Sequence, residues 1–194
     1  MKLVIMTQQA FFVEEDKILS ALFDEGMADL HLRKPGAEPM MAERLLSLLP
    51  ETTYGKITVH DHYYLKNEYR LAGIHIDSAD APPKDYRGKV GRTCSTADAL
   101  AAAKKTADYV FFCAKPAAAG TDTDELNKAA RRGLIDKHVY AAWGISLEDI
   151  REAKELGFGG VVVCEDLWNK FDIHNETDYK DLINHFDKLR KATS

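Results

Sequence analysis

Short apolar runs that recur along the chain constrain its fold more than any other feature. Eight runs are rich in branched residues, and most gaps between them carry apolar residues at the three- and four-residue spacing of amphipathic helices. The runs lie at 2–6, 28–33, 56–60, 73–76, 89–93, 108–113, 139–143 and 160–164. Alternating strands and helices pair the strands in parallel through right-handed crossovers. The pattern therefore predicts an α/β protein.

Eight strand–helix units are the number that closes a (β/α)8 barrel. We therefore predict one compact TIM barrel spanning residues 1–194, with an open doubly wound sheet as the structural alternative. The segment 77–89, between the fourth and fifth predicted strands, is too rich in proline for a full helix, so this crossover is expected to be eroded. The clearest predicted helices lie at 14–26, 39–50, 95–105, 123–134 and 146–157.

Composition excludes several classes of protein. Hydrophobic residues make up 45% of the chain and charged residues 29%, which is typical of globular proteins. The formal charge of -5 argues against a general nucleic-acid binder.

The first apolar run is too short for a signal peptide or a membrane span, so a cytoplasmic location is expected. Three cysteines without CxxC spacing, at Cys94, Cys113 and Cys164, are expected to be reduced thiols. The sequence leaves open whether the chain forms a homo-oligomer.

Polar residues gather where the second, third and fourth predicted strands end. The carboxyl ends of parallel strands carry the functional sites of barrels and open α/β sheets. Period-two alternation turns Leu30 and Leu32 towards the helices and the polar residues of the same strand towards the barrel axis. The polar residues at these strand ends are Asp29, His31, Arg33, His60, Asp61, His62, His75 and Asp77. The sequence thus predicts a site at this rim.

Arginine beside several carboxylates suits a phosphate ligand together with a hard cation. A guanidinium binds phosphate oxygens bidentately, and Mg²⁺ prefers one or two carboxylates plus water. Arg33 is the candidate for the phosphate. The alternative is an interior ion pair of Arg33 with Asp29 or Asp61. Lys34 is interpreted as a solvated loop residue.

The three histidines at the strand ends admit two interpretations. His31, His60 and His75 are either hydrogen-bonded core residues or, together with Asp61, ligands of a zinc or iron ion. The second interpretation describes a His-rich metal-dependent hydrolase. Asp77 faces inward with His75, and the alternative for this residue is a simple cap of the turn that follows it.

These segments resemble, in order and over nearly the whole chain, the thiamine phosphate synthase family and its TenI-like relatives. In "HLRKP", Arg33 matches the family arginine, His31 replaces a glutamine, and Lys34 stands one place before the family lysine. In "VHDHYYL", Asp61 stands at the metal-binding aspartate and His60 at an asparagine.

The later segments continue the resemblance. "GIHIDSADAP" is the most specific match and places Asp80 at the second magnesium-binding aspartate of the family. Thr93 in "VGRTCSTADAL" takes the place of a serine, and Gly144 in "AAWGIS" matches a glycine that precedes the phosphate site. Cys164 and Glu165 stand where the family has a serine and a valine after the eighth strand.

The resemblance implies an enzyme of thiamine biosynthesis that joins an aminopyrimidine diphosphate to a thiazole phosphate with loss of diphosphate. It implies Mg²⁺ on Asp61 and Asp80, and catalytic roles for Arg33 and Thr93. Its partners would be the phosphorylated pyrimidine and thiazole. The implied substrate-binding residues are His31, Arg33, Lys34, His60, Thr93, Lys115, Gly144, Cys164 and Glu165.

Departures from the family pattern leave alternatives open. The loop after the sixth strand lacks the family's hydroxyl pair and lysine; Lys115 lies several residues early, and Ala114 stands where TenI-like tautomerases have a histidine. Glu165 brings a carboxylate to the expected phosphate position, which predicts weak or absent activity with thiazole phosphate. The alternatives are a TenI-like thiazole tautomerase and a non-catalytic ligand-binding or regulatory paralogue, besides the metal-dependent hydrolase.

Overall fold

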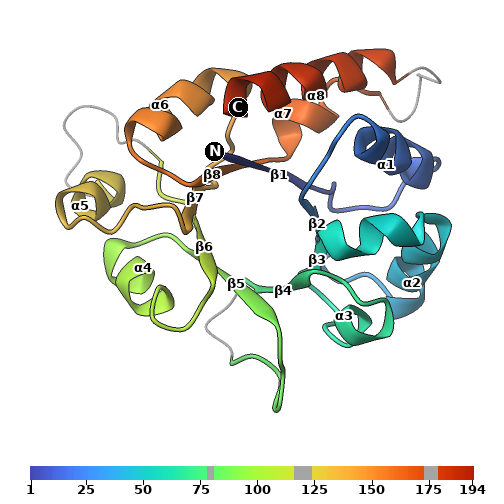
Figure 1. Cartoon of the computed structure of the whole chain (residues 1–194), viewed down its shortest axis with the longest axis horizontal. Helices are drawn as coiled ribbons and strands as arrows, with labels where there is room; N and C mark the ends of the chain where they lie inside the picture. The colour runs from blue at the N-terminus through green and yellow to red at the C-terminus, as the bar shows by residue number, and fades with distance from the viewer. Residues whose placement is uncertain (78–80, 116–123, 173–178) are drawn as a thin grey trace.

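A closed barrel of eight parallel strands organises the chain, with the helices arranged around its outside (Figure 1). The computed structural model describes residues 1–77, 81–115, 124–172 and 179–194. Each strand pairs with the next in sequence, and β8 pairs with β1 in the register Lys2↔Gly160 to Ile5↔Val163. This last pairing closes the sheet. The predicted TIM barrel is confirmed, and the open doubly wound sheet is wrong.

All eight predicted strands are present. They are β1 (Lys2–Met6), β2 (Leu30–Leu32), β3 (Ile57–Val59), β4 (Gly73–Ile76), β5 (Lys89–Cys94), β6 (Tyr109–Phe112), β7 (Val139–Ala141) and β8 (Gly160–Val163). The α-helices are α1 (Glu15–Asp24), α2 (Pro39–Leu48), α3 (Leu65–Glu68), α4 (Ala97–Ala103), α5 (Glu125–Arg131), α6 (Ile150–Glu155), α7 (Glu165–Trp168) and α8 (Lys180–Thr193). Two 3₁₀ helices are η1 (Glu51–Lys56) and η2 (Leu147–Asp149).

The five predicted helical segments contain α1, α2, α4, α5 and α6. Between β4 and β5, residue 77 and residues 81–88 form no helix, as the prolines of this crossover predict. Among the described residues, three α-helices and η1 lie outside these segments. α3 and α7 are four residues long, too short to show a helical period, whereas α8 buries Leu182, Phe186 and Leu189 at that period.

Strand alternation divides the buried side chains into two cores. Every second residue faces the helices and joins a large outer core, of which Ile5, Leu30 and Ile74 are examples. The other residues fill the barrel axis, where the apolar ones form a separate cluster. That cluster consists of Val4, Tyr109, Phe111, Tyr140 and Val162, with Met6 and Ala142 packed against it. The barrel interior is therefore a packed core rather than a channel.

A glycine allows the closest approach inside the barrel. A Cβ atom at Gly91 in β5 would overlap the Tyr109 ring and the Nδ1 atom of His75. Any side chain at this position would therefore push His75 and Tyr109 apart. In the described part of the chain, none of the helices combines the length and apolar character needed to span a bilayer.

Candidate active site

Polar side chains from β2, β3, β4 and β5 meet at the carboxyl ends of these strands. His31, His60 and His75 are at most 4% exposed, and their candidate ligand atoms all lie within 4.8 Å of one another. The His60 and His75 rings stack with centroids 4.4 Å apart, and His75 lies 4.2 Å from the Phe111 ring. The predicted convergence of polar groups from neighbouring strand ends is confirmed.

Asp77, which directly follows β4, is the centre of this cluster. Its Oδ2 accepts hydrogen bonds from Arg33 Nε at 2.8 Å and His60 Nδ1 at 3.0 Å, and its Oδ1 accepts one from Thr93 Oγ1 at 2.9 Å. Burial disfavours the charged form, but the hydrogen bonds from His60 and Arg33 prevail and hold the pKa of Asp77 far below its ordinary value. Asp77 is therefore a carboxylate at neutral pH.

This geometry corrects two interpretations made from the sequence. Asp77 is a hydrogen-bonding partner of three side chains rather than a simple turn cap. Arg33 pairs with Asp77 and not with Asp29 or Asp61. The signal for Asp77 was already present in the strand pattern, since alternation places it on the same inward face as His75.

Buried hydrogen bonds extend the cluster below Asp77. His31 Nδ1 and His60 Nε2 share a hydrogen bond of 2.8 Å, and His31 Nε2 lies 3.5 Å from Asp29 Oδ1. Burial lowers the pKa of His31 to about 4 and that of His75 well below 6.5. Both rings are therefore neutral at pH 7, as expected of imidazoles in an apolar interior.

The tautomer of His75 follows from its neighbours. Thr93 Oγ1 donates its only proton to Asp77, so it accepts the hydrogen bond of 2.8 Å from His75 Nε2. A neutral His75 protonated at Nε2 has an acceptor at Nδ1, where the Tyr109 hydroxyl donates at 3.3 Å. Thr93, predicted to be catalytic, thus orients Asp77 from β5 in this structure.

Asp77 binds the Arg33 guanidinium on its Nε side. Arg33 contacts Asp77 through Nε, and its two terminal nitrogens have no hydrogen-bond partner among residues 1–77, 81–115, 124–172 and 179–194. The Arg33 side chain is 31% exposed. Two parallel N–H donors on a fixed guanidinium suit bidentate binding of a phosphate or carboxylate.

Lys34 lies in a different environment from the one predicted. The residue is only 2% exposed, and its Nζ binds Glu15 Oε1 at 2.5 Å and the Ala10 carbonyl at 2.9 Å, above the Phe11 ring. Burial lowers the pKa of Lys34 and raises that of Glu15, while their mutual attraction opposes both shifts. The interpretation of Lys34 as a solvated residue is wrong, because the start of α1 covers it.

Asp61 lies beside this cluster, on the loop after β3. Its Oδ2 accepts a hydrogen bond of 3.0 Å from the Lys34 backbone amide, and the side chain is partly exposed. A carboxylate oxygen at a partly exposed strand end fits the oxygen ligands of Mg²⁺. Asp80, the second predicted ligand, lies outside the described residues.

The three histidines form a group that could hold a transition metal, as the hydrolase interpretation requires. Asp61 does not belong to this group. The ring nitrogens are engaged in hydrogen bonds with one another and with Asp77, Thr93 and Tyr109. These bonds match the interpretation of the histidines as hydrogen-bonded core residues.

The remaining predicted site residues follow β6, β7 and β8. Gly144 is exposed and has a φ of 85°, which favours glycine, and Lys115 is exposed after β6. Cys164 Sγ points to the Thr7 carbonyl at 3.5 Å, and burial raises the pKa of this thiol to about 11. Glu165 is exposed and begins α7. These residues lie at the same end of the barrel as Arg33, but within the described part of the chain no hydrogen bond or ion pair joins their side chains to Asp77 or Arg33.

Comparison with protein families matches residues 3–167 to the family described as thiamine monophosphate synthase. Among solved structures, thiamine phosphate pyrophosphorylase from Bacteroides thetaiotaomicron is 44% identical, with a TM-score of 0.90. The match covers 99% of this chain and 97% of the other. A comparison with curated protein sequences gives no match.

More distant structures share the fold. Thiamine phosphate pyrophosphorylase from Pyrococcus furiosus is 20% identical with a TM-score of 0.73, covering 99% of this chain and 95% of that one. 3-Hexulose-6-phosphate synthase from Salmonella typhimurium is 11% identical with a TM-score of 0.62, covering 98% and 97%. At these identities the likeness concerns the barrel alone.

Proposed function

Because the chain belongs to the thiamine monophosphate synthase family, we propose that it joins an aminopyrimidine diphosphate to a thiazole phosphate and releases diphosphate. One observation carries the assignment of the site: Asp77 holds Arg33 through Nε, which leaves the two terminal nitrogens for the diphosphate. The TenI-like, non-catalytic and hydrolase alternatives are not favoured by this family match.

Arg33 stabilises the departing diphosphate in this proposal. Negative charge develops on the leaving group as the carbon–oxygen bond of the pyrimidine breaks, and two fixed N–H donors bind that charge without reorganising. Asp77 and Thr93 keep the guanidinium in place from below. The thiazole nitrogen then attacks the pyrimidine carbon, and its phosphate binds near Gly144 and Cys164.

Mg²⁺ would be held by Asp61 and Asp80, and when bound it would neutralise charge on the diphosphate oxygens. The histidines are unsuited to this ion, because Mg²⁺ prefers oxygen ligands. The packed interior below them, with Phe111 and Tyr109 across the barrel, excludes water from one side of the site. We also propose a cytoplasmic location, because phosphorylated substrates of this charge do not cross membranes unaided.

Incubation of the purified chain with both substrates and Mg²⁺ tests the proposal. We expect thiamine phosphate and diphosphate to appear in equal amounts, measured by chromatography. Calorimetry should show Mg²⁺ affinity falling in Asp61→Asn and Asp80→Asn, with the exposed Asp85→Asn as the matched control. Absence of product with wild-type protein, or unchanged Mg²⁺ affinity in both variants, would contradict the proposed reaction or its metal site respectively.

A further inference from the structure

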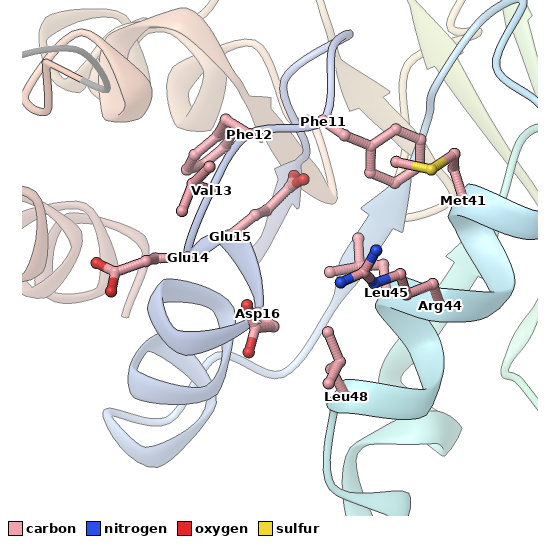
Figure 2. Close-up of a pocket in the computed structure, with 10 residues that line it drawn as sticks. All are labelled: Phe11, Phe12, Val13, Glu14, Glu15, Asp16, Met41, Arg44, Leu45 and Leu48. Carbon is pink, nitrogen blue, oxygen red and sulfur yellow. The ribbon is translucent and has the colours of Figure 1, made fainter.

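A groove on the outside of the barrel runs between the start of α1 and helix α2. Its volume is about 380 Å³, and Figure 2 shows that the loop before α1 borders one side and α2 the other. Phe11, Phe12 and Leu45 contribute apolar walls. The groove is therefore a surface feature that lies apart from the Asp77 cluster.

Exposed apolar residues concentrate around this groove. Val13 is 88% exposed, Leu48 54% and Met41 38%, and all three line it. Met40, 71% exposed, adjoins Met41 in α2, and Tyr64, 48% exposed, hydrogen-bonds Glu43 of the same helix. These five are the large hydrophobic residues exposed in the described surface. Single exposed apolar residues are ordinary, but a cluster of them marks an interaction surface.

Opposite charges flank the groove. Asp16 lies on the α1 side and Arg44 on the α2 side (Figure 2). Neither side chain forms an ion pair with another described residue, whereas the neighbouring Glu14 pairs with Lys17 at 2.6 Å. The described surface thus presents the negative charge of Asp16 on one side of an apolar strip and the positive charge of Arg44 on the other.

We propose that this groove is the interface of a homodimer formed by a second copy of the chain. A two-fold axis along the groove places the α1 side of each copy over the α2 side of the other. Asp16 then meets Arg44 of the partner copy, and Arg44 meets Asp16 of the partner copy, which gives two identical ion pairs. The apolar strip between them, which includes Val13 and Leu48, then packs against the same strip of the other copy. The charge pattern is self-complementary only in this orientation, since a perpendicular axis would bring like charges together.

The mass of the full chain in solution, measured by light scattering and sedimentation between 1 and 100 μM, tests the interface. We expect a dimer for the wild type. Arg44→Glu should raise the dissociation constant by at least about tenfold, because one reversal creates two repulsive contacts in a symmetric dimer. The same reversal at Arg151, which is 90% exposed in α6, is the control and should leave the mass unchanged.

Mixing two variants separates this geometry from a general effect of charge. Asp16→Arg and Arg44→Glu should each be monomeric alone, yet form a mixed dimer, because that dimer has one native ion pair and one ion pair of reversed polarity. Leu48→Lys should weaken association and leave the fold of the monomer intact. A wild-type monomer at 100 μM would overturn the proposal, and so would an equal effect of the Arg151 control or failure of the two variants to associate when mixed.

Discussion

The two sides of the barrel interior differ in chemistry although both belong to one sheet. On the side of β2, β3 and β4, the inward residues are polar and include three histidines, Asp77 and Arg33. On the side of β6, β7, β8 and β1, they form the apolar cluster around Phe111 and Tyr140. β5 lies between the two sides, where Gly91 gives room to His75 and Tyr109 and Thr93 binds Asp77.

The difference between the apolar and the polar side of the interior separates stability from function. Apolar packing resists deformation, and a polar cluster pressed against such a surface has fewer alternative positions for its side chains. Phe111 lies within ring contact of His31, His60 and His75 and therefore connects both sides. We infer that the apolar side supplies stability, while the polar side supplies the charges for the proposed reaction.

Truncation on the apolar side should have the largest effect. Phe111→Ala removes a ring that is 1% exposed, and we expect the free energy of unfolding to fall by about 4 kcal/mol. Urea denaturation measures this loss. Lys105→Ala, at an exposed position outside the groove, is the control and should change stability little. Equal losses in the two variants would mean that the interior cluster does not determine stability.

Removal of charge on the polar side should affect turnover instead. Arg33→Ala is expected to lower kcat/KM by about 10²- to 10³-fold, because two donors to the leaving diphosphate are lost. The free energy of unfolding should change far less, since Arg33 is partly exposed. Arg33→Lys keeps the charge but not the pair of parallel donors, so it should remain strongly impaired. Wild-type kinetics in Arg33→Lys would show that only the charge matters.

Acid should destabilise the polar side first. The pKa of His31 is about 4 in the folded chain and about 6.5 when unfolded, so the unfolded state binds more protons between these values. The stability that the neutral His31 ring contributes is complete above pH 6.5. The free energy of unfolding falls as the pH drops, by about 2 kcal/mol from pH 7 to pH 5. The lowered pKa of His75 acts in the same direction.

Urea unfolding at pH 7 and pH 5 measures this loss, and His31→Gln should reduce it. His138→Gln, at an exposed position outside the barrel axis, serves as the control and should keep the wild-type dependence. If His31→Gln loses as much stability as the wild type over this range, the acid sensitivity has another source.

The smallest expected effect lies at the proposed thiazole phosphate position. Glu165 places a carboxylate at the start of α7, and because it is exposed, solvent screens its repulsion. Glu165→Ser should therefore strengthen binding of thiazole phosphate by about tenfold, which corresponds to about 1.4 kcal/mol. Calorimetric titration measures the gain, with Glu148→Ser in η2 as a control. No gain would mean that the phosphate is bound away from Glu165.

The fold was predictable because strand alternation repeats eight times, and each repeat adds independent support. The ion-pair partners of the polar side chains were not predictable from the sequence. Arg33 had three carboxylates within reach of its strand end, and only the folded geometry selects Asp77. The burial of Lys34 depends on Glu15, a residue distant in sequence that α1 brings over the loop. Local sequence patterns indicate which way a side chain points. Which side chains of different helices and strands pair depends on how those elements pack.

Closure of the barrel by β1 and β8 has a consequence during synthesis of the chain. β1 leaves the ribosome before the other strands, yet one of its edges pairs with the last strand, β8, at residues Gly160–Val163. At roughly 5–20 residues per second, that edge waits on the order of ten seconds for its partner. The nascent chain thus carries an open, apolar strand edge until β8 has been synthesised, a state that favours chaperone binding or association with neighbouring nascent chains.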